Sequence, residues 1–183
     1  MAKDVVEVRS RQDPLRKHYK VSPEDARITD KAVTTGGTQM DPFHGKVVPG
    51  SEDHGIVWPF GIHRAVGGYH DLPNPGDLLS AALATCLDST IRIIAGRMGV
   101  SVTSLSVEVT GDVDVRGCLV VDREVPVGFQ EMRCHVALKA ADGTDPQFVQ
   151  MLLAASENYC VNLQTLRSGV RITTSTDVSF GAA

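Results

Sequence analysis

NPGDLLSAALATC, residues 74–86, contains the signals that start a helix and ends on a thiol about three turns inside it. Asn74 is a good N-cap, because its side-chain oxygen accepts backbone N–H bonds that a first turn leaves unpaired. Pro75 suits the first helical position, where no N–H donor is needed. Asp77 falls at the third helical position, where a carboxylate faces the positive end of the helix dipole. The sequence therefore predicts a helix that begins at Pro75.

Apolar residues continue on almost every side of this helix as far as Met98. Gly99 then suits a left-handed C-cap, so the helix is predicted over 75–98 with Cys86 near its middle. A helix that is apolar nearly all round is buried by the rest of its protein or by a partner subunit. A membrane span is not expected, because charged residues interrupt the apolar run at Asp88, Arg92 and Arg97.

The composition limits the partners and the compartment of the chain. A net charge of -4 and a pI near 5.8 give no electrostatic reason to expect nucleic acid or an anionic membrane as a partner. The N-terminal sequence MAKDVVEVRSRQDPLRKHYK lacks the apolar segment of a secretory signal. The cysteines show neither the C-x-x-C spacing of a zinc ribbon nor the density of a disulfide scaffold: they are Cys86, Cys118, Cys134 and Cys160. We therefore expect a cytoplasmic protein with free thiols.

The order of the expected elements indicates an α+β fold rather than a doubly wound sheet. Residues 1–30 are expected to form a helical arm with helix starts at Asp13-Pro14 and Ser22-Pro23, and residues 31–183 the main domain. Turn residues between 31 and 73 separate short strands such as IVWPF. The elements expected after the long helix are a strand over 107–115 with a bulge at Gly111, a strand over 132–138, a helix over 146–159, a short helix ending at Gly169, and a strand through Val170 and Ile172.

Two of the four cysteines have an ordinary structural interpretation. Cys134 shares a predicted strand face with Met132 and Val136, as a small core hydrophobe does. Cys118 is expected in a strand or hairpin. Taken alone, Cys86 would also be assigned as a buried structural thiol.

Two sequence motifs carry a resemblance to a known family. NPGDLLSAALATCLDST is followed, 74 residues after its cysteine, by the cysteine of ASENYCVNLQTL. The pair resembles the cysteine motifs of the osmotically inducible protein C and organic hydroperoxide resistance family (OsmC/Ohr), over roughly residues 40–178. The resemblance implies antiparallel sheets packed around long central helices in an intertwined homodimer, with active sites at the interface.

The same resemblance implies roles for individual residues. Cys86 corresponds to the peroxidatic cysteine that attacks an organic hydroperoxide, and Cys160 to the cysteine that resolves the sulfenic acid as a disulfide. A nearby cation is needed to stabilise the thiolate, and Arg64 matches the arginine of the family better than Arg27 does. The implied partners are a hydroperoxide substrate and a dithiol reductant such as a lipoylated protein, with no cofactor and no metal.

The chain departs from the family pattern at two positions. Gly76 stands where members with peroxidase activity typically carry Glu, immediately after the Pro of the helix start. Asp77 is one residue later, where a helical rotation of about 100° points it elsewhere; it is either a helix cap or a substitute catalytic acid. Val161 stands where a Pro usually follows the second cysteine. The resemblance therefore indicates a divergent branch.

Three alternatives stay open at this stage. The histidines of residues 44–70, together with Asp53 or Asp71, could ligate a metal, but they lack the spacing that makes a metal site specific; they are His44, His54, His63 and His70. His63 or His70 could activate Cys86 for acyl transfer, which would leave Cys160 without a role. Because Gly76 replaces the acid, the fold could instead be a module that binds an apolar ligand over Cys86.

Overall fold

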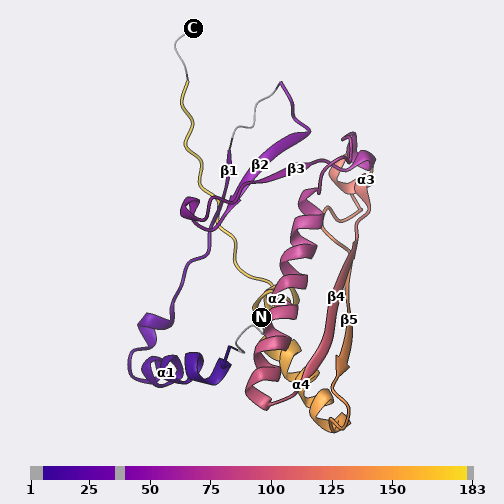
Figure 1. Cartoon of the computed structure of the whole chain (residues 1–183). Helices are drawn as coiled ribbons and strands as arrows, with labels where there is room; N and C mark the ends of the chain where they lie inside the picture. The colour runs from indigo at the N-terminus through magenta and orange to yellow at the C-terminus, as the bar shows by residue number, and fades with distance from the viewer. Residues whose placement is uncertain (1–5, 36–39, 181–183) are drawn as a thin grey trace.

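The computed structural model describes residues 6–35 and 40–180 and is built around one long helix, α2 (Pro75–Met98) (Figure 1). The Asn74 side chain accepts hydrogen bonds from the backbone N–H groups of Gly76 and Asp77. The Asp77 carboxylate accepts a 2.9 Å bond from the Asn74 N–H in return, which completes a capping box. Gly99 ends the helix in the left-handed conformation, at φ 74°. The predicted bounds of this helix are confirmed.

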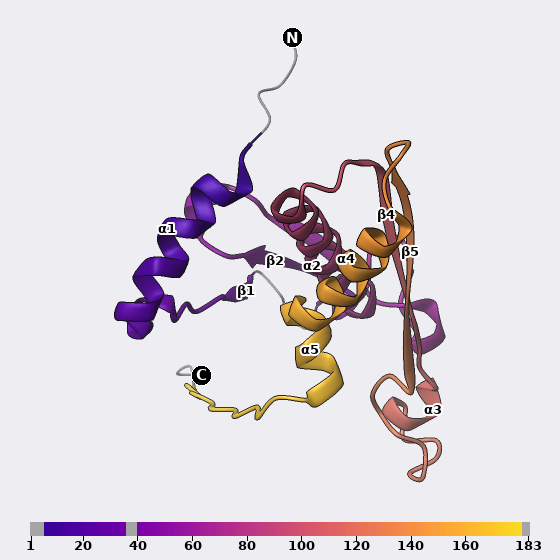
Figure 2. The ribbon, with the colours of Figure 1, turned by 90° about the horizontal axis from the view of Figure 1, so that it is seen from below.

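One face of α2 packs against the second half of the chain. This half contains β4 (Val102–Asp112), β5 (Glu131–Ala140), α4 (Pro146–Tyr159) and α5 (Val161–Ser168). Figure 2 shows α2 with the β4–β5 sheet along one side and α4 and α5 along another. The buried core lies between them and comprises Leu83, Leu87, Ile91, Ala95, Val100, Leu152, Cys160 and Leu163. The α4 helix begins and ends where the sequence predicts.

The β4 and β5 strands form an antiparallel pair whose inner face covers α2. Val107 pairs with Val136 and Val109 with Cys134, so alternate residues point toward the helix. The predicted bulge at Gly111 is wrong, because the register shifts between Val102 and Ser104 instead. Glycine is needed at position 111 for a different reason, since a Cβ there would lie 2.6 Å from the Phe129 ring.

A second, separate sheet precedes α2. It is antiparallel, in the order β1 (Ala32–Thr35), β2 (His44–Pro49) and β3 (Trp58–Gly61), with short 3₁₀ turns η2 (Glu52–His54) and η3 (Arg64–Val66) around β3. Figure 1 shows this sheet beside the N-terminal end of α2, away from the β4–β5 sheet. The prediction of short strands between turns in this region is confirmed.

The N-terminal arm forms one α-helix, α1 (Val8–Val21), and a short turn, η1 (Pro23–Ala26). The first helix starts before Asp13-Pro14, so the predicted start is wrong and Pro14 lies inside the helix. The Arg9 guanidinium donates to the Arg97 carbonyl at the C-terminal end of α2. Arg97 in turn pairs with Asp13 at 2.9 Å. These bonds hold the arm against α2; residues 1–5 of the expected arm lie outside the described residues.

Two predicted strand segments differ in the structure. The strand expected to reach Val115 ends at Asp112, because the Asp114 side chain accepts the Arg116 N–H and starts the short helix α3 (Val115–Cys118). Cys118 therefore lies exposed in a helix and not in a strand. The strand expected through Val170 and Ile172 does not form, since residues 169–180 run past the end of α5 without pairing to any strand that the structure describes.

Only part of the α2 surface is covered by this chain. By length and composition α2 could cross a bilayer, and the same is true of many core helices of soluble proteins. Only 22% of its most apolar 18-residue window is buried. The buried residues of α2 recur at intervals of four, which leaves much of the helix surface open: Leu83, Leu87, Ile91 and Ala95.

Candidate active site

Cys86 occupies the middle of α2 and is half-buried. Hydroxyl side chains surround it on the helix, and they bond to backbone carbonyls: Ser89 Oγ donates to the Cys86 carbonyl at 3.0 Å and Thr90 Oγ1 at 2.8 Å. Thr85 Oγ1 donates back to the Ala81 carbonyl at 2.8 Å. These hydroxyls are therefore engaged by the backbone, as is common for Ser and Thr within helices.

Cys160 lies at the junction of α4 and α5. It is the C-cap of one helix and the N-cap of the next, with an extended backbone at φ -75° and ψ 112°. Its N–H donates to the Ser156 carbonyl at 3.0 Å, and its carbonyl accepts the Gln164 N–H at 3.0 Å. The side chain is fully buried. The helix break before Cys160 thus forms although Val161 replaces the Pro of the family pattern.

The structure brings the two thiols together across 74 residues of sequence. Both cysteines are free, and Cys86 packs against the core cluster that contains Cys160, close enough for its thiol to shift the pKa of Cys160. Burial raises the pKa of the Cys160 thiol, and the neighbouring Cys86 raises it further. Cys160 is therefore held in its protonated form beside the more accessible Cys86.

Side-chain hydrogen bonds hold the α4–α5 junction and fix it against α2. Asn162 Nδ2 donates to the Ala82 carbonyl at 2.8 Å, one turn before Cys86. Gln164 Nε2 donates to the Glu157 carbonyl at 2.7 Å, and Arg167 pairs with the Glu157 carboxylate at 2.9 Å. The sequence analysis did not single out these residues. The only sequence feature that could have indicated Asn162 is its place two residues after Cys160.

Among the described residues, no hydrogen bond or ion pair joins the other candidate catalytic residues to either thiol. Arg64 begins η3 with an exposed side chain whose guanidinium forms no ion pair or side-chain hydrogen bond within residues 6–35 and 40–180. Arg27 is exposed just after η1. The backbone N–H and the side-chain amide of Asn74 both donate to the Asp77 carboxylate, so Asp77 is part of the helix cap.

The four histidines of the loop-rich region divide into separate environments. His44 lies between Asp41 and Asp71, whereas the rings of His63 and His70 meet edge to face with centroids 4.3 Å apart. Within the described part of the chain, no three His, Cys, Asp or Glu side chains are grouped so that they could hold a metal ion.

Two cavities flank the N-terminal half of α2. The smaller, about 730 Å³, lies between α2, β5 and the α4–α5 pair. Four of its wall residues belong to the same core cluster as Cys160: Leu83, Leu87, Ile91 and Leu163. Cys134 also lines it, and burial raises the pKa of that thiol. An apolar space thus lies one layer of side chains from the thiol pair.

The larger cavity, about 1180 Å³, lies at the N-terminal end of α2. Its walls are the 62–70 segment, the first three turns of α2, the end of β4 and the connection between β4 and β5. Phe129 lines both cavities. A Cβ at Gly76 would lie 3.1 Å from the Phe129 ring, so this aromatic ring occupies the space beside the position where the family pattern has Glu.

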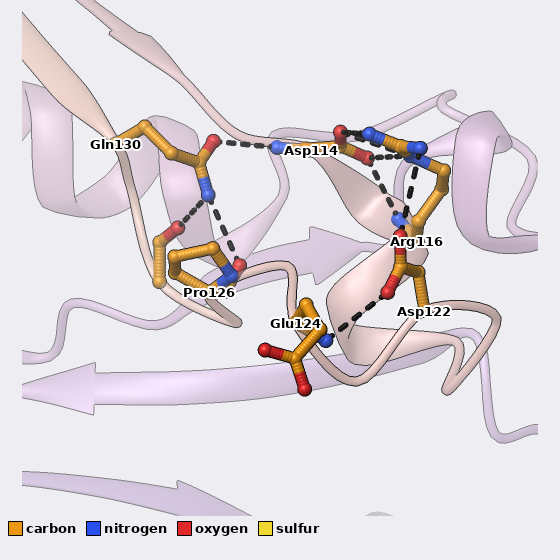
Figure 3. Close-up of polar contacts among 7 residues, drawn as sticks. Asp114, Arg116, Asp122, Glu124, Pro126 and Gln130 are labelled. Carbon is orange, nitrogen blue, oxygen red and sulfur yellow. Dashed lines mark hydrogen bonds and ion pairs between the residues drawn. The ribbon is translucent and has the colours of Figure 1, made fainter.

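Hydrogen bonds fix the connection that carries Phe129 (Figure 3). The Gln130 side chain accepts the Asp114 N–H at 2.7 Å and donates to the carbonyls of Pro126 and Gly128. Arg116 pairs with Asp114, which lowers the pKa of that carboxyl. The wall between the two cavities is therefore held in place by its own polar contacts.

Comparisons with known proteins agree with this architecture. The family model described as "OsmC-like protein" matches residues 68–175. An OsmC-like protein from Mycoplasma pneumoniae is 12% identical, with a TM-score of 0.61 over 78% of this chain and 89% of that chain. An OsmC-like protein of unknown function from Vibrio cholerae is 12% identical, with a TM-score of 0.62 over 76% of this chain and 94% of that chain.

A third similar structure is an organic hydroperoxide resistance protein from Elizabethkingia anophelis. It is 18% identical, with a TM-score of 0.59 over 78% of this chain and 91% of that chain. No curated protein matches the chain. At these identities the solved structures show a shared fold.

Proposed function

Because the chain belongs to the OsmC-like protein family, we propose that it is a thiol peroxidase that reduces organic hydroperoxides through Cys86 and Cys160. The observation that carries this proposal is the contact between the two thiols, one half-buried in α2 and one fully buried at the α4–α5 junction. A thiol pair already in contact needs little rearrangement to form a disulfide, which requires Cα atoms within about 7 Å.

The proposed reaction has two steps. The Cys86 thiolate attacks the terminal oxygen of the hydroperoxide; the O–O bond breaks, the alkoxide leaves with a proton as an alcohol, and Cys86 becomes a sulfenic acid. Cys160 then attacks the Cys86 sulfur. The S–O bond breaks, the Cys160 proton and the hydroxyl leave as water, and a Cys86–Cys160 disulfide forms. A dithiol reductant restores both thiols.

The environments of the two thiols support this order of events. Cys86 is the more accessible sulfur, so a peroxide reaches it first. Burial and the raised pKa keep Cys160 as a thiol until the sulfenic acid offers it a partner. The apolar walls around the pair favour a hydrophobic peroxide over hydrogen peroxide.

The remaining parts of the proposal rest on the family resemblance and on the sequence pattern. Arg64 is the proposed cation for the Cys86 thiolate, and the reductant is a dithiol such as a lipoylated protein. The protein acts as a cytoplasmic homodimer, and its N-terminal residues 1–30 form an arm on a domain of residues 31–183. The uncovered surface of α2 supports the dimer, because an apolar helix gains stability when a partner covers it.

Mass spectrometry after addition of one equivalent of cumene hydroperoxide tests the reaction. The wild type should form the Cys86–Cys160 disulfide. Cys160→Ser should stop at a Cys86 sulfenic acid that a dimedone-type probe traps, and excess peroxide should carry it to the sulfinic acid. Cys86→Ser should form no disulfide. Cys118→Ser and Cys134→Ser are the matched controls and should react as the wild type does.

Cys86 and Cys160 both unmodified in the wild type would overturn the peroxidase proposal. The second candidate function is then an apolar-ligand module, which the two cavities beside α2 favour. Such a module should bind a fluorescent apolar probe such as anilinonaphthalene sulfonate without changing the oxidation state of any cysteine.

A further inference from the structure

His44, the first residue of β2, lies between two carboxylates. Its Nδ1 is 2.9 Å from Asp41 Oδ2, and its Nε2 is 3.0 and 3.1 Å from the two carboxylate oxygens of Asp71. The ring stacks on Tyr69, with centroids 5.5 Å apart and planes 6° apart, and the Phe43 ring meets Tyr69 edge on. This cluster joins the start of β2 to the segment that precedes α2.

The geometry of the cluster requires a charged imidazole. An ionised carboxylate only accepts hydrogen bonds, and a neutral imidazole carries a single N–H. Neutral His44 can therefore satisfy Asp41 or Asp71 but not both. Asp41 and then Asp71 raise the pKa of His44 above its usual 6.5, and His44 lowers the pKa of both carboxyls.

Asp71 belongs to a compact loop, residues 61–73. Gly61 pairs with His44 across β2 and β3, and a Cβ on Gly61 would lie 3.3 Å from Asp71 Oδ1, so the glycine leaves the carboxylate room to reach His44. Backbone bonds close the loop on itself: Gly61 N–H to the Pro73 carbonyl at 3.0 Å, His70 N–H to Ile62 at 3.1 Å, and Gly68 N–H to His63 at 3.1 Å.

The same loop forms one wall of the larger cavity. Ile62, His63, Ala65, Val66 and His70 all line that cavity. The His44–Asp71 ion pair joins residue 71, near the C-terminal end of this loop, to the first residue of β2. A change at His44 therefore reaches the cavity wall through Asp71, which directly follows the cavity-lining His70.

We propose that the His44 imidazolium is a proton-operated latch that holds the 61–73 loop closed against the larger cavity, and that loss of its proton releases the loop and opens the cavity to ligands. The latch goes beyond the proposed peroxidase reaction, since it needs neither Cys86 nor Cys160. Through the latch, the access of a ligand to the cavity at the N-terminal end of α2 depends on pH.

The direction of the pH dependence follows from linkage. The pKa of folded His44 is raised, so its contribution is fully present below about pH 6.5 and is lost as pH rises through the raised value. The pKa values of Asp41 and Asp71 are lowered, so their contribution is present above about pH 4 and is lost as pH falls through the lowered values. The latch is closed between these limits and opens on the alkaline side.

Amide hydrogen exchange by NMR, corrected for the intrinsic effect of pH, tests the latch. The protection of the Gly61, Gly68 and His70 amides should fall by about tenfold or more over the same pH range in which the His44 ring titrates. His44→Gln should hold the protection at the low, alkaline level of the wild type at every pH and remove the transition. The exposed His135 provides a matched control, and His135→Gln should leave the transition unchanged.

Asp71→Asn separates the proton mechanism from a merely structural role. The new amide can donate to the bare nitrogen of a neutral His44 while the other nitrogen donates to Asp41. The loop should then stay protected at alkaline pH, with the transition lost. A wild-type transition in Asp71→Asn would overturn the latch.

The other titrating groups of the loop give a second way to overturn the proposal. If the transition persists in His44→Gln, it belongs to another group of the loop, which contains His63, Tyr69 and His70, and the latch is refuted. Peroxidase activity does not enter this readout. Failure of the peroxidase proposal and failure of the latch are therefore distinguishable.

Discussion

A thiol in the middle of an apolar helix needs a positive charge to become a good nucleophile. The helix dipole offers little at Cys86, because its effect fades beyond the first turn and Cys86 is near the centre of α2. The neighbouring hydroxyls bond to the backbone. We propose that a cationic side chain supplies the charge; Arg64 is the candidate, since its exposed guanidinium forms no ion pair with the residues that the structure describes.

Arg64→Ala should slow the alkylation of Cys86 by iodoacetamide near neutral pH and move the midpoint of the pH profile upward. Loss of about 1 kcal/mol of charge stabilisation would reduce the rate by about fivefold. Arg123→Ala, at an exposed arginine of the β4–β5 connection, is the control. An unchanged profile in Arg64→Ala would contradict the assignment and favour Arg27 or a histidine.

Among the elements, the helices with local start signals were the most predictable from sequence. Asn74 and Asp145 each accept backbone N–H groups at a helix start, and these bonds depend on residues only two or three positions away. The β4 strand ends before the predicted Val115 for an equally local reason, because Asp114 caps the helix that follows. The alternation of valines gave no sign of this cap. The 170–172 strand failed because a strand needs a distant partner that local sequence does not specify.

The candidate site shows the same division between local and distant information. Periodicity places Cys86 mid-helix and Cys160 after a helix, but their contact spans 74 residues and followed only from the family resemblance. Tertiary packing creates the hydrogen bond from Asn162 to the Ala82 carbonyl. It also places the Phe129 ring beside Gly76. No pattern within one element could have predicted them.

Removal of the α2 cap should destabilise the whole fold. Asn74→Ala loses the acceptor for two N–H groups and should lower the free energy of unfolding by about 1 kcal/mol. For a chain of this size that corresponds to a fall of about 2–4 °C in Tm. Asn74→Ser keeps an acceptor and should stay close to the wild type in a thermal scan. Equal losses in both variants would show that the cap bonds contribute little.

At the scale of the whole molecule, this chain leaves much of the α2 surface uncovered. Ile93 is 39% exposed, and Ala82 and Thr85 are also exposed on the face that carries Cys86. The outer face of the β4–β5 sheet is polar and needs no cover: it presents Ser106, Glu108, Arg133 and Lys139. A second copy packed on α2 would bury the apolar face and bring the partner subunit close to the thiol pair.

Sedimentation velocity at micromolar concentration should therefore find a homodimer for the wild type. Ile93→Glu places a charge where the partner helix would pack, and burying an unpaired carboxylate is costly, so this variant should sediment as a monomer. The matched control Ala137→Glu adds the same charge to the polar outer face of β5 and should remain a dimer. A monomeric wild type would contradict the assembly. A dimeric Ile93→Glu would place the interface away from this face of α2, and the thiol pair would then have to work within a single subunit.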